Sequence, residues 1–258
     1  MKRSGVLMLL LAVTLMAGCA SQTTGSGNAA NSPQDALEAY TNLGLQYLQA
    51  GNTVNAKTSV QRAIAIDSGY APAYNAMALI FQTEQEFELA EEYFRKAMSA
   101  DRTSAMIHNN YGAFLFSQQR YGEACEQLNQ ATTDPFYQQR AQAFENLGRC
   151  YLLIDSPEKA EEAFRRSLAI NGNRPVALVE LSGLLLDKGE NAASNRLFER
   201  FRELVDQQRT EHSSRSLWLG IRLARTERNV SRAATYALLL KNLYPKSQEY
   251  RLYEETAQ

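Results

Sequence analysis

An internal repeat is the feature that most limits how this chain of 258 residues can fold. The repeat has a period of about 34 residues. In each clear unit a large apolar residue precedes a small one, and one or two alanines follow in the second half. The residues of this pattern are Leu43, Gly44, Ala56 and Ala63 in the first unit and Leu147, Gly148 and Ala160 in the fourth. A unit of this size cannot bury its apolar residues alone, so we expect a stack in which each unit packs against the next.

The period and pattern are typical of tetratricopeptide repeats, in which each unit is a pair of helices joined by a turn. Good helix formers are abundant and there are only six prolines, while no segment alternates as a strand would. We therefore predict an all-α fold, a right-handed superhelix of about six repeats. The predicted repeats lie near 37–70, 71–104, 105–138, 141–174, 175–208 and 213–246. Leu252 and Tyr253 lie in a last segment that is expected to cap the final apolar face.

The N-terminus has the features of an export signal. Residues 1–18 are predicted to be a lipoprotein signal peptide, because two basic residues precede an apolar run over 6–17 that is too short to span a bilayer. The residues before Cys19 resemble the bacterial lipobox, after which the cysteine becomes an acylated N-terminus. An ordinary signal peptide cleaved elsewhere is the alternative. Ala20 follows, and by analogy with Gram-negative lipoproteins the absence of Asp there predicts transfer to the outer membrane.

Residues 19–34 are predicted to be the acylated cysteine and a flexible tether, since they are rich in Ser, Thr, Gly and Asn without an apolar period. One acyl chain binds a membrane only marginally, whereas the two or three chains expected on Cys19 would anchor the protein firmly. We expect the repeat domain, residues 35–258, to face the periplasm from the outer membrane. No cofactor other than these covalent acyl chains is predicted.

Composition and charge exclude several classes of function. The formal net charge is −1 with both signs interspersed, which argues against a nucleic-acid-binding protein. The two histidines stand in unrelated contexts, so no pair with metal-ligand spacing exists. The chain contains no G-x-S-x-G, glycine-rich phosphate loop or C-x-x-C motif. We therefore predict that the protein is not an enzyme, holds no metal and works by binding another protein.

Two cysteines remain once Cys19 is acylated. In the repeat register Cys125 lies on the second helix of the third repeat and Cys150 on the first helix of the fourth. Neighbouring repeats bring these two faces together, and an exported protein meets an oxidising compartment. A disulfide is one prediction and a pair of buried free thiols is the alternative.

The first helices of tetratricopeptide repeats line the concave face of the stack, and this face is the candidate binding site. The predicted groove residues are Leu45, Leu48, Asn75, Leu79, Met106, Asn109, Phe116, Glu145, Arg149 and Leu152. Apolar and amide side chains in this mixture suit an amphipathic helix or an extended segment whose backbone the amides can bind. Packing of some of these residues into the interior of the superhelix is the alternative.

Four segments are more specific than helix packing requires. They are Asn-Asn-Tyr-Gly-Ala-Phe-Leu at 109–115, Phe-Glu-Asn-Leu-Gly at 144–148, Ser-Leu-Trp-Leu-Gly-Ile-Arg-Leu-Ala at 216–224 and Leu-Tyr-Pro-Lys-Ser at 243–247. These segments resemble the type IV pilus biogenesis/stability lipoproteins of the PilF/PilW family, and the likeness includes the insertion at 134–137.

This resemblance implies a pilotin, an outer-membrane lipoprotein that binds a subunit of the type IV pilus secretin. Such a protein promotes the outer-membrane localisation and oligomerisation of the secretin, and hence pilus biogenesis and twitching motility. The family's contact surface is placed in its N-terminal repeats. A second hypothesis is a lipoprotein adaptor that recruits cell-wall hydrolases or a periplasmic protease. Under either hypothesis the chain is expected to be monomeric.

Overall fold

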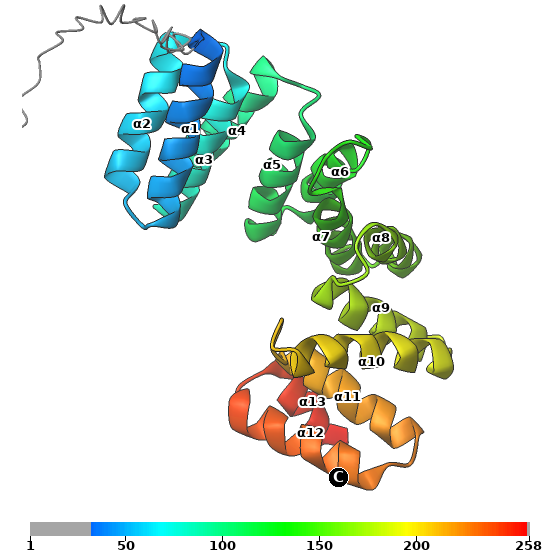
Figure 1. Cartoon of the computed structure of the whole chain (residues 1–258). Helices are drawn as coiled ribbons and strands as arrows, with labels where there is room; N and C mark the ends of the chain where they lie inside the picture. The colour runs from blue at the N-terminus through cyan, green and yellow to red at the C-terminus, as the bar shows by residue number, and fades with distance from the viewer. Residues whose placement is uncertain (1–31, 257–258) are drawn as a thin grey trace, which may run out of the picture.

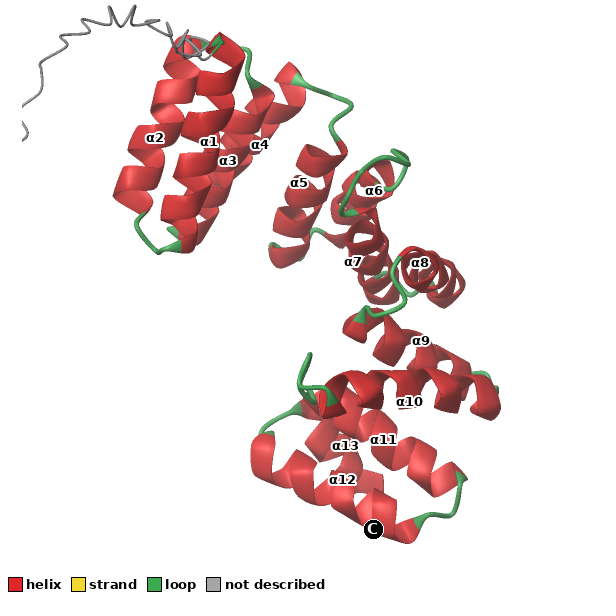
Figure 2. Cartoon of the chain, viewed as in Figure 1, coloured by secondary structure: helices red, strands yellow, loops and turns green. Residues whose placement is uncertain are grey.

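A computed structural model describes residues 32–256, and these residues form thirteen helices and no strand (Figure 2). The helices are α1 (Pro33–Gln49), α2 (Thr53–Ile66), α3 (Ala71–Thr83), α4 (Phe87–Ala100), α5 (Ala105–Ser117), α6 (Tyr121–Ala131), α7 (Arg140–Leu153), α8 (Pro157–Ile170), α9 (Pro175–Asp187), α10 (Asn191–Asp206), α11 (Ser214–Thr226), α12 (Val230–Leu243) and α13 (Gln248–Thr256). The predicted signal peptide, Cys19 and most of the predicted tether lie outside the described residues. No helix within 32–256 combines the length and the apolar character needed to cross a membrane.

The helices pair in sequence order, and each predicted repeat contains one pair, from α1 with α2 to α11 with α12. The pairs follow one another along a curve (Figure 1). In the middle of the stack α5, α7 and α9 lie on the inner side of this curve, and α6 and α8 lie on its outer side (Figure 1). The prediction of an all-α superhelix of tetratricopeptide repeats is therefore confirmed.

Small residues allow the two helices of a repeat to approach closely. A Cβ atom added at Gly148 would lie 2.6 Å from Cε1 of Phe164, and one added at Gly112 would lie 2.8 Å from Cγ of Leu128. Phe164 and Leu128 are both fully buried, so they have no free space into which to move. The small-residue position of the repeat pattern is thus a steric requirement of helix pairing.

The turn inside each repeat closes in the same way. The second residue after the first helix has a positive φ in all six repeats, and these residues are Gly51, Gln85, Gln119, Asp155, Gly189 and Arg228. The next residue then donates its backbone N–H to a carbonyl five positions earlier, as Asn52 does to Tyr47 and Glu86 does to Phe81, both at 2.9 Å. This bond completes a Schellman cap, so every helix pair begins from the same turn geometry.

The first helix begins earlier than predicted. The tether was expected to extend through 34, but α1 begins at Pro33. Ser32 Oγ accepts a hydrogen bond from the backbone N–H of Asp35 at 3.1 Å, and Asp35 Oδ2 accepts one from the Ser32 N–H at 2.7 Å. This reciprocal capping box, with a proline at the first helical position, stabilises the helix start, and so the predicted boundary was wrong by two residues.

The last helix caps the stack through tyrosines. Tyr250 and Tyr253 of α13 pack against the apolar cluster formed by the fifth and sixth repeats. Their spacing of three residues places both on one helix face, whereas Leu252 lies on another face and is exposed. Arg225 lies 5.6 Å from the ring centroid of Tyr253 and adds a cation–π contact. The predicted capping role therefore holds for Tyr253 and is wrong for Leu252.

Candidate protein-binding groove

Seven of the ten predicted groove residues have side chains that are at least partly accessible, and three of them, Phe116, Arg149 and Leu152, line one cavity. The surface that carries them, named the inner groove, is formed by the first helices of the repeats. Its half-buried or exposed members are Leu45, Leu48, Leu79, Met106, Phe116, Arg149 and Leu152. They come from α1, α3, α5 and α7, so one partner segment lying along the groove could contact several repeats.

The other three predicted groove residues are buried, and for them the prediction was wrong. Only 2% of Asn75 and 3% of Asn109 is exposed. Asn110 Nδ2 donates to Asn75 Oδ1 at 3.2 Å, and Asn146 Nδ2 donates to Asn109 Oδ1 at 3.3 Å. Each bond joins the first helices of two successive repeats. These amides therefore connect repeats to one another and are not available to bind the backbone of a partner.

Glu145 is buried for a related reason. Its carboxylate accepts hydrogen bonds from Nε and Nη2 of Arg174 and, at 3.1 Å, from the backbone N–H of Ala177 in the first turn of α9. A carboxylate that is paired with a guanidinium and lies at a helix N-terminus is compensated twice for its loss of water. The Glu145 side chain thus fixes α9 against α7, and it joins the fourth repeat to the fifth.

The inner groove holds a cavity that spans the third to the sixth repeats. This cavity of about 260 Å³ is lined by Phe116 of α5, three residues of α7, Glu180 of α9 and Arg215 of α11. The α7 residues are Arg149, Leu152 and Leu153. A second cavity, of about 150 Å³, shares Phe116 and Arg149 with the first. Four repeats therefore contribute to one hollow, and the centre of it lies on α7.

The two arginines that line this cavity differ in their partners. Arg215 forms an ion pair with Glu180 at 3.0 Å. Arg149 is exposed and forms no ion pair with any described carboxylate, and its guanidinium lies 5.2 Å from the ring centroid of Phe116. An apolar floor beside an arginine of this kind suits a peptide that carries a large apolar side chain and a carboxylate. Among residues 32–256 no group of three or more His, Cys, Asp or Glu side chains could hold a metal ion.

Sequence reasoning did not include Leu153, Glu180 or Arg215 in the groove. Glu180 and Arg215 are 35 residues apart, and so are Asn75 and Asn110. Each pair joins the first helices of successive repeats, so the spacing of about one repeat length is a signal that could have found both. The spacing does not show which of these residue pairs are exposed to solvent, because exposure depends on the angle between repeats.

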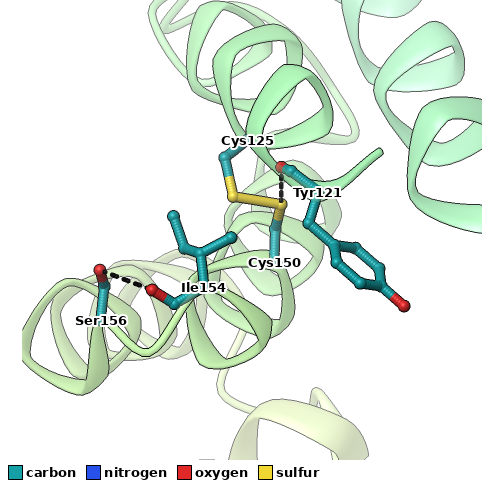
Figure 3. The surroundings of a disulfide bond; sticks show 5 residues. All are labelled: Tyr121, Cys125, Cys150, Ile154 and Ser156. Atoms are coloured by element: carbon teal, nitrogen blue, oxygen red, sulfur yellow. Dashed lines mark hydrogen bonds between the residues drawn. A yellow bond between two sulfur atoms is a disulfide. The ribbon is translucent and has the colours of Figure 1, made fainter. Parts of the chain in front are cut away.

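A disulfide joins Cys125 of α6 to Cys150 of α7 (Figure 3). Their Cα atoms are 5.6 Å apart, within the usual range for disulfides, and both residues are buried. The carbonyl oxygen of Tyr121 lies 3.2 Å from Cys150 Sγ. A disulfide sulfur carries no hydrogen, so this approach is a packing contact. Of the two alternatives left open by the sequence, the structure has the bonded pair.

The disulfide occupies a place that carries charge in other repeats. Lys57, Glu91 and Glu161 stand at the position equivalent to Cys125 and pair with the next repeat. The pairs are Lys57 with Glu84 at 2.8 Å, Glu91 with Arg120 at 2.8 Å and Glu161 with Lys188 at 2.5 Å. Burial opposes ionisation of Glu91, but hydrogen bonds from Arg120, Arg95 and Tyr111 lower the pKa of its carboxyl group. One junction is thus covalent where its neighbours are ionic.

Comparisons with known proteins agree with this architecture. The tetratricopeptide repeat family matches residues 37–70, 71–104 and 103–171. The type IV pilus assembly protein PilF of Pseudomonas aeruginosa is 41% identical over 251 residues, which cover 96% of each chain. The chain belongs to the PilF/PilW family of type IV pilus proteins.

Solved structures of this family match the fold. A structure of Pseudomonas aeruginosa PilF superimposes with a TM-score of 0.79 at 41% identity, and the match covers 87% of this chain and 99% of that one. A crystal structure of PilW, a widely conserved type IV pilus biogenesis factor, superimposes with a TM-score of 0.68 at 28% identity, over 84% of this chain and 97% of PilW. The chain is therefore a PilF-like tetratricopeptide repeat protein of type IV pilus biogenesis.

Proposed function

We propose that this PilF/PilW family member is a pilotin, a lipid-anchored protein of the outer membrane that binds a subunit of the type IV pilus secretin. The inner groove is the observation that carries the proposal. It provides an apolar floor at Phe116 and Leu152 and the guanidinium of Arg149, which pairs with no carboxylate of residues 32–256, in a chain 41% identical to a type IV pilus assembly protein. A surface of this kind binds a protein segment and needs no catalytic group.

The mechanism follows from combining the groove with the anchor. A secretin subunit bound in the groove is tied to a protein that acyl chains on Cys19 hold at the membrane. The local concentration of secretin at the outer membrane rises, because the bound subunit can no longer diffuse away from the membrane. Oligomerisation depends steeply on that concentration, so binding alone promotes both localisation and assembly. The protein acts in this proposal as a scaffold and not as an enzyme.

Deletion of the gene tests the proposal. We expect loss of heat-resistant secretin multimers and of twitching motility, and recovery of both when the native chain is restored. Unchanged multimers in the deletion strain would contradict the secretin as the cargo. If cell-wall hydrolases or a periplasmic protease were mislocalised at the same time, the adaptor function would be the correct one.

The Cys19→Ser variant tests the anchor separately. It should accumulate as a folded chain released from the membrane, and the secretin should no longer reach the outer membrane. The matched control is Ser21→Ala, two residues further along, which should leave membrane attachment and secretin level unchanged. Normal outer-membrane secretin in the Cys19→Ser strain would contradict the anchoring mechanism while leaving the groove as a binding site.

A further inference from the structure

Helix α7 carries a second pocket, on a different face from the inner groove. This pocket, named the outer pocket, has a volume of about 440 Å³. Its floor is formed by Phe144, Leu147 and Tyr151 of α7, and its rim by Lys159, Glu162 and Arg166 of α8. Successive residues of a helix are rotated by about 100°. Leu147 and Tyr151 are therefore each about 160° around the helix from Arg149. The residues that line the outer pocket from outside α7 come from α6 and α8.

The floor of the outer pocket is apolar and firmly packed. Phe144 is 8% exposed and Leu147 is 3% exposed, and both belong to the buried cluster that connects the second, third and fourth repeats. Tyr151 is half-buried, and burial together with the nearby carboxylate of Glu162 raises the pKa of its hydroxyl group. A floor of aromatic and aliphatic side chains held by the core can accept one large apolar side chain without rearranging.

The cations at and beside the rim form no ion pair within the described residues. The guanidinium of Arg166 lies 5.6 Å from the ring centroid of Phe144, and the Lys159 ammonium lies 5.7 Å from that of Tyr151. A third cation, Arg140, lies 5.4 Å from the Phe144 ring and is oriented by a hydrogen bond of 2.8 Å from its Nε to a backbone carbonyl. None of the three forms an ion pair with a carboxylate in the part of the chain that the structure describes.

Other cations on the second helices are paired with carboxylates. Arg165, next to Arg166, pairs with Glu161 at 2.7 Å, and Lys96 of α4 pairs with Glu92 at 2.7 Å. Glu162 is the only carboxylate among the described residues that line the outer pocket, whereas two cations, Lys159 and Arg166, line it. The pocket therefore has an excess of positive charge around an apolar floor, although the whole chain is close to neutral.

We propose that the outer pocket is a second docking site, and that it binds a peptide segment in which a carboxylate flanks a large apolar side chain. The apolar side chain lies on Phe144 and Leu147, and the carboxylate lies between Lys159 and Arg166. Charge complementarity selects this ligand, because an acidic group neutralises the rim and a basic one would be repelled. The site goes beyond the proposed function, because a segment bound here leaves the inner groove free for another chain.

The disulfide prepares this pocket for binding. Asn129 of α6 lines the pocket one helical turn after Cys125, and Cys150 is adjacent to Tyr151 of the floor. The covalent bond therefore holds the α6 wall against the α7 floor (Figure 3). A wall that is already in position reduces the ordering cost of binding.

Selection of random peptides displayed on phage tests the proposal. The target is the purified oxidised chain with residues 20–258, which contains every described helix, and the counter-target is its Lys159→Glu/Arg166→Glu variant. Peptides that prefer the native target should carry Asp or Glu beside Phe, Leu or Trp. No enrichment over the counter-target, or enrichment of peptides without a carboxylate, would overturn the proposal.

Affinities of one enriched peptide then assign the site. Fluorescence polarisation should show binding at least about tenfold weaker to Arg166→Glu and to Lys159→Glu, and close to native binding to Arg166→Lys. The matched controls are Arg196→Glu, an exposed arginine of α10, and Arg149→Glu in the inner groove, and neither should change the affinity. Binding lost in Arg149→Glu and retained in Arg166→Glu would place the peptide in the inner groove and refute the outer pocket.

Two further readouts separate binding from folding. The circular dichroism and melting temperature of the Lys159 and Arg166 variants should equal those of the native chain, because both side chains are exposed. Salt raised from about 50 mM to about 500 mM should weaken the peptide's binding, as expected for a carboxylate recognised by cations. Salt-independent binding would contradict the charged rim. Secretin binding should be native in these variants, so failure of this proposal would leave the proposed function standing.

Discussion

The junction between the third and fourth repeats differs in chemistry from the junction between the fourth and fifth. Both bury apolar side chains, as every junction of a repeat stack must. The third and fourth repeats are also joined by the Cys125–Cys150 disulfide. The fourth and fifth are joined instead by the buried Glu145–Arg174 ion pair, which also binds the first turn of α9. Helix α7 takes part in both junctions.

Both pockets use side chains of α7, the helix that the two junctions share. A covalent bond on one side of this helix and a buried ion pair on the other restrict its movement relative to α6 and α9. The central hollow of the inner groove and the floor of the outer pocket use side chains of this same helix. The two junctions respond to different conditions. The disulfide requires an oxidising compartment and does not depend on salt. The ion pair requires an ionised carboxylate and does not depend on the redox state.

Removal of the disulfide should change the free energy of unfolding the most. The variant Cys125→Ser/Cys150→Ser should lose about 2–4 kcal/mol of the free energy of unfolding, because the cross-link closes a loop of moderate length in the unfolded chain. Denaturant unfolding followed by circular dichroism measures this loss. The native chain treated with reductant is the control and should fall to the level of the variant. Equal stability of the native and variant chains would show that apolar packing alone holds the junction.

A smaller effect is expected from breaking the ionic junction. Glu145→Gln removes the charge but keeps the shape, and it leaves Arg174 without its carboxylate. We expect a loss of about 1–3 kcal/mol in the same unfolding experiment, and the loss should persist in reductant. The matched control is Glu162→Gln, an exposed carboxylate on the second helix of the same repeat, which should change stability very little. A loss for Glu162→Gln as large as that for Glu145→Gln would mean that burial does not decide the effect.

The smallest effect is expected at the junction between the fifth and sixth repeats, where aromatic rings lie beside His212. The His212 ring lies 5.5 Å from that of Phe201 and 5.7 Å from that of Tyr236. Burial, with help from the positive charge of Arg202, lowers the pKa of His212. The unfolded chain then binds the proton more readily, so the stability is complete above the ordinary pKa of about 6.5 and decreases as the pH falls below it.

Melting temperatures from about pH 7.5 to about pH 5.5 measure this dependence. The native chain should melt at a lower temperature at the acidic end, by less than the shift caused by Glu145→Gln. His212→Gln should show a shallower dependence, because Gln does not take up a proton. If the melting temperature of His212→Gln decreased more steeply with falling pH than that of the native chain, the pKa of His212 would be raised by folding and not lowered.

The sequence alone was sufficient for the helices and their pairing. The steric need for Gly112 and Gly148 is local to one helix pair, so it leaves a regular pattern in the chain. The start of α1 was placed late because the Ser32 capping box lies in a segment whose composition resembles a linker. Periodicity and the small-residue positions are local properties of one helix pair, and for this reason the sequence shows them directly.

The binding site was predictable only in part, because it depends on the angle between repeats. The repeat pattern assigns Asn109 and Phe116 to one face of α5. It does not give the distance from that face to α7, the first helix of the next repeat. In the structure that helix covers Asn109, through Asn146, and leaves Phe116 open to a cavity. The outer pocket was missed because the register marks Phe144 and Leu147 as packing positions. Exposure of their rim depends on the separation of α6 and α8.

Binding of the purified chain with residues 20–258 to the purified secretin subunit tests whether the inner groove holds that subunit. Calorimetry should show saturable binding by the native chain and affinity at least about tenfold weaker for Phe116→Asp. The matched control is Leu238→Asp on α12, which is 59% exposed and lies outside the inner groove, and it should bind as the native chain does. Absence of binding by the native chain, or native affinity in a folded Phe116→Asp variant, would contradict the account.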